Sequence, residues 1–257
     1  MEGNVMIKHK IVITLLVFML IALWSESVLS QEPKLIARWP LDENSGSVVG
    51  DVIGGNNGKL EGGPKWIGAK FGNGLQFDKK PGQYVEIPRA PELAPADSLT
   101  LSVWVNVNST AGRQEIFCYA DSYVIHIDGG FFKAYIHQGG AFPRTTWKTS
   151  VQVDKWYFLA MTYDSKDLKL YVDGKFDGSA KLPGGIDFID LPLRFSNNPA
   201  APAEAWGVSG TIDEVELWDK PMTAEEILKA YESPLDFLSV SPTGNLITVW
   251  GKLKSVK

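Results

Sequence analysis

Residues 155–178 read KWYFLAMTYDSKDLKLYVDGKFDG, and this stretch decides the predicted fold. Residues 156–163 are apolar or aromatic at successive positions, which is typical of a strand buried on both faces. In residues 168–172 the aliphatic side chains alternate with other types, so this strand buries mainly one face. Asp173-Gly174 indicates a tight turn, because a type I′ turn requires φ > 0 at both central positions. The stretch therefore predicts a β-meander.

The rest of the chain repeats this pattern of short strands separated by Gly-, Pro- and Asn-rich turns. Residues 114–127 are interpreted as two strand segments or one bent strand, residues 147–153 as another strand, and residues 206–218 as the last long strand. Thr223 and Glu226 form the pattern of a capping box, which predicts one helix through about Tyr231. The sequence thus predicts an all-β sandwich.

The meander resembles the core hairpin of laminin G-like domains in the concanavalin A-like lectin/glucanase superfamily. Three further stretches are similar to that family: IARWPLD at 36–42, FGNGLQFDKKPGQYVEIP at 71–88, and GTIDEVELWD at 210–219. The resemblance covers residues 35–231 in order. It implies a two-sheet antiparallel jelly-roll sandwich with one short C-terminal helix. Because the family is functionally broad, it implies less about activity.

Residues 1–30 have the pattern of a signal peptide. Lys8 and Lys10 precede an uncharged apolar run at 11–24, which is too short for a comfortable membrane span. Cleavage before Gln31 is expected, which would leave no membrane span and a protein that is secreted, periplasmic or on the cell surface. The alternative is an uncleaved anchor.

The remaining chain is divided into a β-sandwich domain at 31–233 and a tail at 234–257. The tail alternates weakly around Pro242 to Asn245, so we expect a small hairpin or a loose tail. The alternative is an exposed strand that pairs with another protein.

The net charge argues against a nucleic-acid-binding protein, and the cysteine count excludes an intrachain disulfide. The net charge is −5, which argues against a nucleic-acid partner because such a partner requires a basic face. Cys118 is the only cysteine, so no intrachain disulfide forms. It lies in an apolar strand-like run, where we expect a small buried side chain and not a nucleophile.

No catalytic residues are predicted. Glucanases of the superfamily carry Glu-x-Asp-x-x-Glu on a strand, and the corresponding stretch here begins with Thr211, which cannot be a carboxylate nucleophile. Asp213 shares the alternation of Val215 and Leu217, which places it on the core side of the strand. The two histidines outside the signal peptide, His126 and His137, are interpreted as hydrogen-bonded structural residues.

A structural calcium ion is expected because members of the superfamily often hold one. Calcium binds oxygen ligands from loops, and the candidates are Asp42, Asp51, Asn56 and Asp213. Pairing of the first and last strands would bring Asp42 or Asp51 near Asp213. The alternative is that these side chains shape turns and accept backbone hydrogen bonds.

Tryptophans beside loops are candidates for sugar stacking, because an indole ring packs on the apolar face of a sugar. Trp147 ends the loop that contains Arg144, and Trp206 closes the loop that contains Asn197 and Asn198. These five residues are the predicted ligand site. The alternative is that the tryptophans cover the core.

The sequence therefore predicts an exported, non-catalytic binding module that recognises a glycan or glycoconjugate and holds a calcium ion. The first alternative is a protein-binding or adhesion module of the cell envelope without a sugar site. The second is a degenerate glycoside hydrolase.

Overall fold

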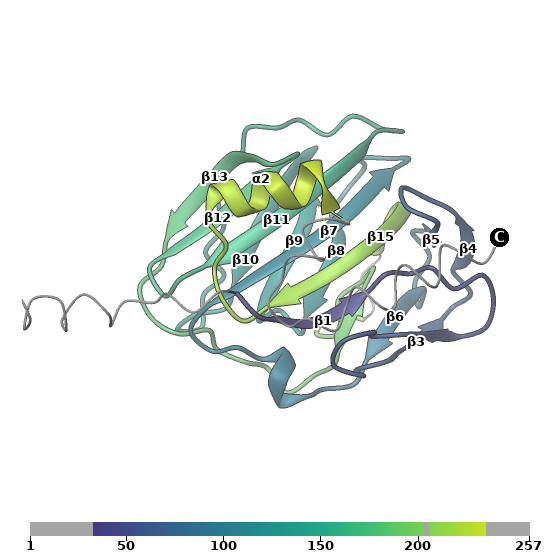
Figure 1. Ribbon diagram of the computed structural model, residues 1–257, viewed down its shortest axis with the longest axis horizontal. Helices are drawn as coiled ribbons and strands as arrows, with labels where there is room; N and C mark the ends of the chain where they lie inside the picture. Colours follow the sequence, from purple (N-terminus) through teal and green to yellow (C-terminus); the bar gives the residue numbers. More distant parts are fainter. Residues whose placement is uncertain (1–32, 203–205, 235–257) are drawn as a thin grey trace, which may run out of the picture. The chain divides into compact units, whose positions relative to one another are not determined.

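The computed structural model describes residues 33–202 and 206–234. The predicted signal peptide at 1–30 and the predicted hairpin of the tail lie outside these residues. The described part forms two antiparallel sheets and one short α-helix, as the sequence predicted, and one 3₁₀ helix that was not predicted (Figure 1).

Each sheet takes strands from distant parts of the chain. Sheet A runs in the order β13 (Lys175–Lys181), β12 (Asp167–Val172), β11 (Trp156–Tyr163), β7 (Leu99–Val107), β15 (Ser209–Trp218), β5 (Asn73–Asp78) and β4 (Lys65–Gly68), and β1 (Leu35–Trp39) also pairs with β15. Sheet B runs in the order β10 (Phe131–Ile136), β9 (Tyr123–Asp128), β8 (Gln114–Tyr119), β14 (Leu193–Phe195), β6 (Tyr84–Ile87), β3 (Gly58–Glu61) and β2 (Val48–Val49).

The predicted meander is present as β11, β12 and β13. Asp173 and Gly174 have φ of 50° and 74°, as a type I′ turn requires. The Phe158 backbone N–H donates to Asp173 Oδ1 at 3.0 Å, which ties the turn to the neighbouring strand. The prediction from residues 155–178 is confirmed.

The main core lies between the two sheets. Its aromatic centre is built from both sheets: Trp39 of β1 meets Phe195 of β14 edge-to-face at 5.3 Å between ring centroids. Phe195 in turn packs against Phe117 of β8 at 5.6 Å. Alternate residues of every long strand point into this cluster, so the remaining residues of the same strands face outward.

The outer face of sheet A is covered by α2 (Ala224–Glu232). The 3₁₀ helix η1 (Pro91–Leu93) lies elsewhere in the chain, between β6 and β7. Helix α2 crosses β11 and β7 (Figure 1). Tyr231 stacks on Trp104 of β7 at 5.7 Å, and Ile227 is fully buried in the same cluster. The Thr223 side chain accepts from Glu226 N, and Glu226 Oε2 accepts from Thr223 N, so the predicted capping box is confirmed.

Strand β15 contains a β-bulge that reverses its alternation. Glu214 adopts φ of 48°, and the pairing of β15 with β7 shifts between Asp213 and Glu216. Ile212 and Val215 both point into the core, and Asp213 lies on the opposite face together with Glu216. The prediction that Asp213 shares the face of Val215 was wrong, because one extra residue shifts the period.

The predicted strand at 147–153 is a loop instead, with a single β-bridge from Ser150 to Phe131. Asp177 of β13 accepts hydrogen bonds from the backbone N–H groups of Lys148 and Thr149 at 3.1 and 2.9 Å. A side-chain carboxylate thus satisfies donors that a neighbouring strand would otherwise satisfy. We call residues 137–153 the docked loop.

Candidate functional site

The outer face of sheet B is polar and aromatic. On β9 and β10 the core takes alternate residues, so Val124, His126, Lys133 and Tyr135 point away from it. Cys118 of β8 lies on the same outer face, packed with Val124 and Tyr135. We call this surface the polar face of sheet B. The docked loop, residues 196–202 and Trp206 border it.

A hydrogen-bond network is centred on Tyr135. Arg113 Nη2 donates to Tyr135 Oη at 2.9 Å, and the Tyr135 hydroxyl donates to Asp121 Oδ1 at 2.5 Å. Arg113 Nε donates to Glu115 Oε1 at 2.7 Å. Asn198 Nδ2 donates to Asp121 Oδ1 at 2.5 Å. Residues 113–121 on one side and Asn198 on the other therefore hold one tyrosine side chain in place.

Burial controls the charges of this network. It raises the pKa of Glu115, while the Arg113 guanidinium acts in the opposite direction. It also raises the pKa of Tyr135 far above its usual range, with the nearby Glu115 adding to the effect, so the hydroxyl remains a donor. In the described part of the chain, one group of His, Cys, Asp or Glu side chains has its ligand atoms close enough together to suit a metal ion, namely Glu115, Cys118 and Asp121. Hydrogen bonds from Arg113, Tyr135 and Asn198 already occupy its carboxylates.

The structure brings three of the five predicted ligand residues to this network. The Arg113 guanidinium lies 4.4 Å from the Trp206 ring centroid, and Asn198 donates to Asp121. The Arg144 guanidinium lies 5.6 Å from the Tyr135 ring centroid. Residues from two separate loops therefore meet around a strand residue.

The other two predicted residues have different surroundings. Trp147 is 45% exposed, and Lys133 Nζ lies 4.2 Å from its ring centroid, so its ring belongs to the surface and not to the core. Asn197 is buried with φ of 108°, and its Oδ1 accepts from Asn198 N at 2.7 Å. Asn197 therefore shapes the turn that presents Asn198.

Arg113, which precedes β8, and Tyr135 on β10 were not predicted from the sequence, and the expectation for His126 differs from the structure. His126 is fully buried, and neither ring nitrogen has a hydrogen-bond partner among the described residues, so the expectation of a hydrogen-bonded histidine was wrong. His137 Nδ1 is also without one. The alternation of apolar core residues with His126, Lys133 and Tyr135 along β9 and β10 is the one local signal of this face.

Burial lowers the pKa of His126 well below its usual value. The positive charges of Arg113, Arg144 and Lys133 add to this effect. The imidazole is therefore neutral at pH 7. The same interactions mean that three cationic side chains surround one point of the polar face.

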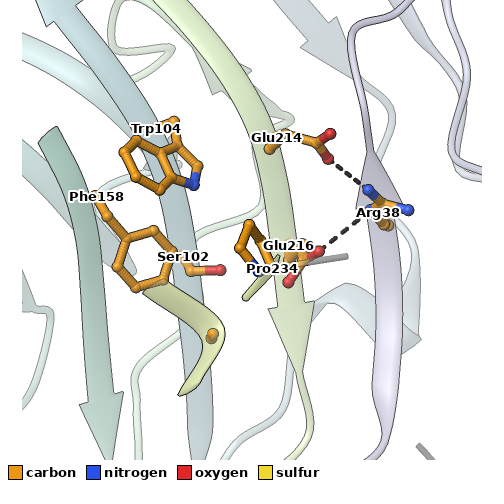
Figure 2. Close-up of a pocket in the computed structure, with 8 residues that line it drawn as sticks. Arg38, Ser102, Trp104, Phe158, Glu214, Glu216 and Pro234 are labelled. Atoms are coloured by element: carbon orange, nitrogen blue, oxygen red, sulfur yellow. Dashed lines mark hydrogen bonds and ion pairs between the residues drawn. The ribbon is translucent and has the colours of Figure 1, made fainter. Parts of the chain in front are cut away.

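A second buried polar region lies beside α2, where Arg38 of β1 bridges two carboxylates of β15 (Figure 2). Arg38 Nη2 lies 2.6 Å from Glu214 Oε2, and Arg38 Nε lies 3.1 Å from Glu216 Oε1. The cavity beside them, which Trp104 and Phe158 also line, has a volume of about 10 Å³. That is room for about one water molecule and not for a sugar ring.

These carboxylates occupy the region where the glucanase motif was sought. The bulge places Asp213 and Glu216 on one face, but Thr211 holds the first position. Burial raises the pKa of Asp213 to about 8 and that of Glu214 to about 7. Arg38 ties up Glu216, so the region has neither the free carboxylate pair nor the space that retaining hydrolysis requires.

The predicted calcium ligands form two groups. Asp51 accepts from the backbone N–H groups of Arg38, Gly54 and Asn56, which is the role of a turn-shaping side chain. Asn56 Nδ2 donates to Asp51 Oδ2 at 3.1 Å.

Asp42 and Asp213 accept hydrogen bonds from one short segment. Asp213 Oδ2 accepts from Phe71 N at 2.9 Å, and Asp42 Oδ1 accepts from Asn73 N at 3.1 Å. Asp213 Oδ1 is buried with no partner among the described residues. A buried carboxylate oxygen without a donor is a feature that a cation ligand would have. This second pair fits a calcium ion better than the first.

Among residues 33–202 and 206–234, no helix has the length and apolar character needed to cross a membrane.

Comparison with known proteins identifies similar folds. A family model described as the concanavalin A-like lectin/glucanases superfamily matches residues 77–228. Domain 4 of the extracellular arabinanase AbnA from Geobacillus stearothermophilus, in complex with arabinotriose, is similar with a TM-score of 0.65 and 16% identity, covering 77% of this chain and 98% of that domain.

Toxin binding domains are also similar. The binding domain of Paraclostridial Mosquitocidal Protein 1 has a TM-score of 0.65 and 12% identity, covering 78% of this chain and 52% of that one. The binding domain of botulinum neurotoxin DC, in complex with rat synaptotagmin II, has a TM-score of 0.61 and 17% identity, covering 77% and 51%. The chain thus spans about half the length of these toxin domains. No curated protein sequence matches it significantly.

Proposed function

Because the chain belongs to the concanavalin A-like lectin/glucanase superfamily, as residues 77–228 establish, we propose that it is a binding module for a glycan or glycoconjugate. The site is the polar face of sheet B. The observation that carries this proposal is the convergence of Arg144, Asn198 and Trp206 on the Tyr135 network. Trp147 flanks the same face.

The chemistry of this face suits a sugar. A sugar ring has weakly apolar faces and a rim of hydroxyl groups, so its site needs flat aromatic surfaces with polar groups beside them. Trp147 and Phe142 are exposed at 45% and 40%, and both lie on the docked loop. Asn198 and Arg144 supply polar groups. The strands beneath hold these groups on a rigid support.

The similar structures support this proposal at the level of binding. One was solved with arabinotriose, and another with rat synaptotagmin II. The second complex favours an alternative function, the capture of a protein receptor. Val153 and Phe176, which are exposed at 47% and 48%, would be available to such a partner.

Export and calcium belong to the same proposal. Residues 1–30 would direct the chain out of the cytoplasm, to a secreted, periplasmic or cell-surface location, where glycans are available. Asp42 and Asp213 would hold a structural calcium ion, with Asp51 and Asn56 shaping the adjoining turn. We infer no catalysis, because Thr211 replaces the nucleophile position and Arg38 neutralises Glu216.

The test of binding compares three exposed or partly exposed aromatic residues. Trp147→Ala and Trp206→Ala should each lose retention on a glycan array and in polysaccharide affinity gels. Phe176→Ala is the matched control, because it removes an exposed ring on β13 outside the face. All three variants should melt within a few degrees of the parent, since surface substitutions usually change stability by about 0.5 kcal/mol or less.

Two results would contradict the proposal. The first is equal binding by all four proteins to whichever glycan is retained. The second is capture of a protein ligand while no glycan is retained, which would favour the receptor-binding alternative. Incubation with β-glucans, galactans and xylans should release no new reducing ends, and turnover abolished by Glu216→Gln would instead establish a hydrolase.

A further inference from the structure

Arg144 differs from every other arginine in the described part of the chain. Arg38, Arg89, Arg113 and Arg194 each pair with a carboxylate. The Arg144 side chain is exposed, and its guanidinium lies over the Tyr135 ring with no carboxylate or carbonyl acceptor among the described residues. A guanidinium has five donors in a planar fork that matches a carboxylate in two parallel hydrogen bonds.

The backbone of Arg144 is anchored although its guanidinium fork is unoccupied. Its backbone forms a β-bridge with Tyr135 on β10. The next residue, Thr145, is buried and donates its N–H to Ala134 O at 2.9 Å. The guanidinium is therefore presented from an anchored backbone, so little ordering of the loop backbone is required when a ligand binds.

Two of the three nearby acidic groups are paired with cations. Glu115 pairs with Arg113 at 2.5 Å, and Asp128 pairs with Lys133 at 3.0 Å. Asp121 accepts from Tyr135 and Asn198. His126 beneath the face is neutral at pH 7, and its pKa is lowered by burial and by the charges of Arg113, Arg144 and Lys133. Of the three cationic side chains around His126, Arg144 is thus the one without a carboxylate partner among the described residues.

A local cation is significant because the chain as a whole is acidic, with a net charge of −5. The overall charge would repel an anionic polymer, so recognition of one would depend on a specific unpaired cation. Trp147 and Phe142 lie on the same loop as Arg144 and provide the aromatic surface for the sugar ring.

We propose that the ligand is a carboxylated glycan, with a uronic or sialic acid residue whose carboxylate binds Arg144. This rests on the proposed function and adds the chemical class of the ligand. The sugar ring packs against the exposed aromatic surface of the docked loop. Its carboxylate accepts two hydrogen bonds from the guanidinium.

The experiment uses an array in which each carboxylated glycan stands beside its carboxyl-reduced counterpart, with sulfated and neutral glycans on the same surface. The purified protein should retain carboxylated glycans and bind the reduced forms at least about 10-fold more weakly, because charge-assisted hydrogen bonds are lost. In solution, polygalacturonate and its methyl ester provide the same comparison with one sugar backbone.

Two variants separate a specific contact from general attraction. Arg144→Gln should weaken binding to the carboxylated glycan by about 10- to 100-fold and leave binding to the reduced form unchanged. Arg144→Lys keeps the charge but lacks the fork, so most of the loss should remain. Lys148→Gln removes one exposed positive charge from the same loop, where its Nζ lies over Phe176 at 5.2 Å, and should bind as the parent does.

Each other outcome has a defined meaning. Preference for neutral or sulfated glycans, or equal losses in Arg144→Gln and Lys148→Gln, overturns the carboxylate assignment while glycan binding itself stands. No retention of any glycan overturns both the assignment and the proposed function.

Discussion

His126 is a buried histidine whose two ring nitrogens have no partner among the described residues. Its pKa is lowered well below 6.5, first by burial and then by the charges of Arg113, Arg144 and Lys133. Below about pH 6.5 the unfolded chain therefore takes up a proton that the folded chain refuses. His126 stabilises the fold above that pH, and this contribution is lost as the pH falls.

The prediction is that His126→Phe reduces the acid sensitivity of the protein. Between pH 7 and pH 5 the parent should lose about 2 kcal/mol more unfolding free energy than the variant, because one proton changes stability by about 1.4 kcal/mol per pH unit. Urea unfolding at both pH values measures this. Burial raises the pKa of Asp213 to about 8, which acts in the opposite direction, so the comparison is made between the two proteins. Parallel pH profiles would contradict the prediction.

Asp177 is the residue that fixes the docked loop. It is buried and accepts from Lys148 N, Thr149 N and Thr149 Oγ1. Beside it, a Cβ added to Gly178 would collide with the backbone carbonyl of Thr146. The loop backbone therefore lies directly against β13, and a carboxylate and a missing side chain both permit that approach.

We predict that Asp177→Ala weakens glycan binding without contacting the ligand. Removing the acceptor leaves the loop N–H groups without a partner, which should cost about 1–3 kcal/mol of stability. It should also release the loop that presents Arg144 and Trp147. Amide exchange should rise in residues 144–150, and glycan affinity should fall with it. Unchanged exchange in the loop would show that other contacts hold it.

At the scale of elements, α2 depends on its capping box. Thr223→Ala removes the acceptor for Glu226 N, and such a change typically costs about 1 kcal/mol. Because Tyr231 of α2 stacks on Trp104, loosening of the helix should be visible in tryptophan fluorescence before global unfolding. Thr223→Ser keeps the hydroxyl and is the matched control. Equal urea midpoints for the two variants would contradict the role of the cap.

Some elements could be predicted from local sequence patterns and others could not. The meander and α2 followed from local patterns, namely alternation, the Asp173-Gly174 turn and the Thr223–Glu226 pair. The face of Asp213 did not, because the bulge depends on Glu214 at positive φ, a conformation that glutamate does not favour locally. Residues 147–153 alternate as a strand would, but Asp177 takes their backbone donors.

The candidate site was predictable only in its loops. Trp147, Trp206, Arg144 and Asn198 stood out as aromatic and polar residues beside turns. Tyr135 and Arg113 lie in or next to strands, where a single sequence does not indicate which sheet face meets solvent and which meets the core. The pairing of β8, β9 and β10 determines that, and pairing is a property of the folded chain.

For the whole molecule, a bound calcium ion should raise stability. Extracellular calcium modules have Kd values near about 10⁻⁴–10⁻³ M. At about 2 mM calcium, a Kd of about 0.1 mM gives about 1.8 kcal/mol, or about 4–7 °C in melting temperature. A thermal scan with and without chelator measures this, and Asp213→Asn should remove the difference.

The pH dependence of this effect follows from Asp213. Its carboxyl has a pKa of about 8 when no cation is present, because burial raises it. Calcium must displace that proton, so the calcium-dependent rise in melting temperature should increase from pH 6 to pH 8.5. An unchanged melting point at every pH, with no calcium found by metal analysis, would rule out the site.

The burial of Cys118 makes its thiol a probe for the opening of sheet B. It is the only thiol in the chain, it is fully buried, and burial raises its pKa well above the usual value. A thiol reagent can therefore label the protein only when sheet B opens. Labelling kinetics under native conditions would report the rate of that opening. Because Cys118 packs against Tyr135, a bound glycan should slow the labelling of this thiol. The labelling rate would then measure the fraction of the protein that has glycan bound.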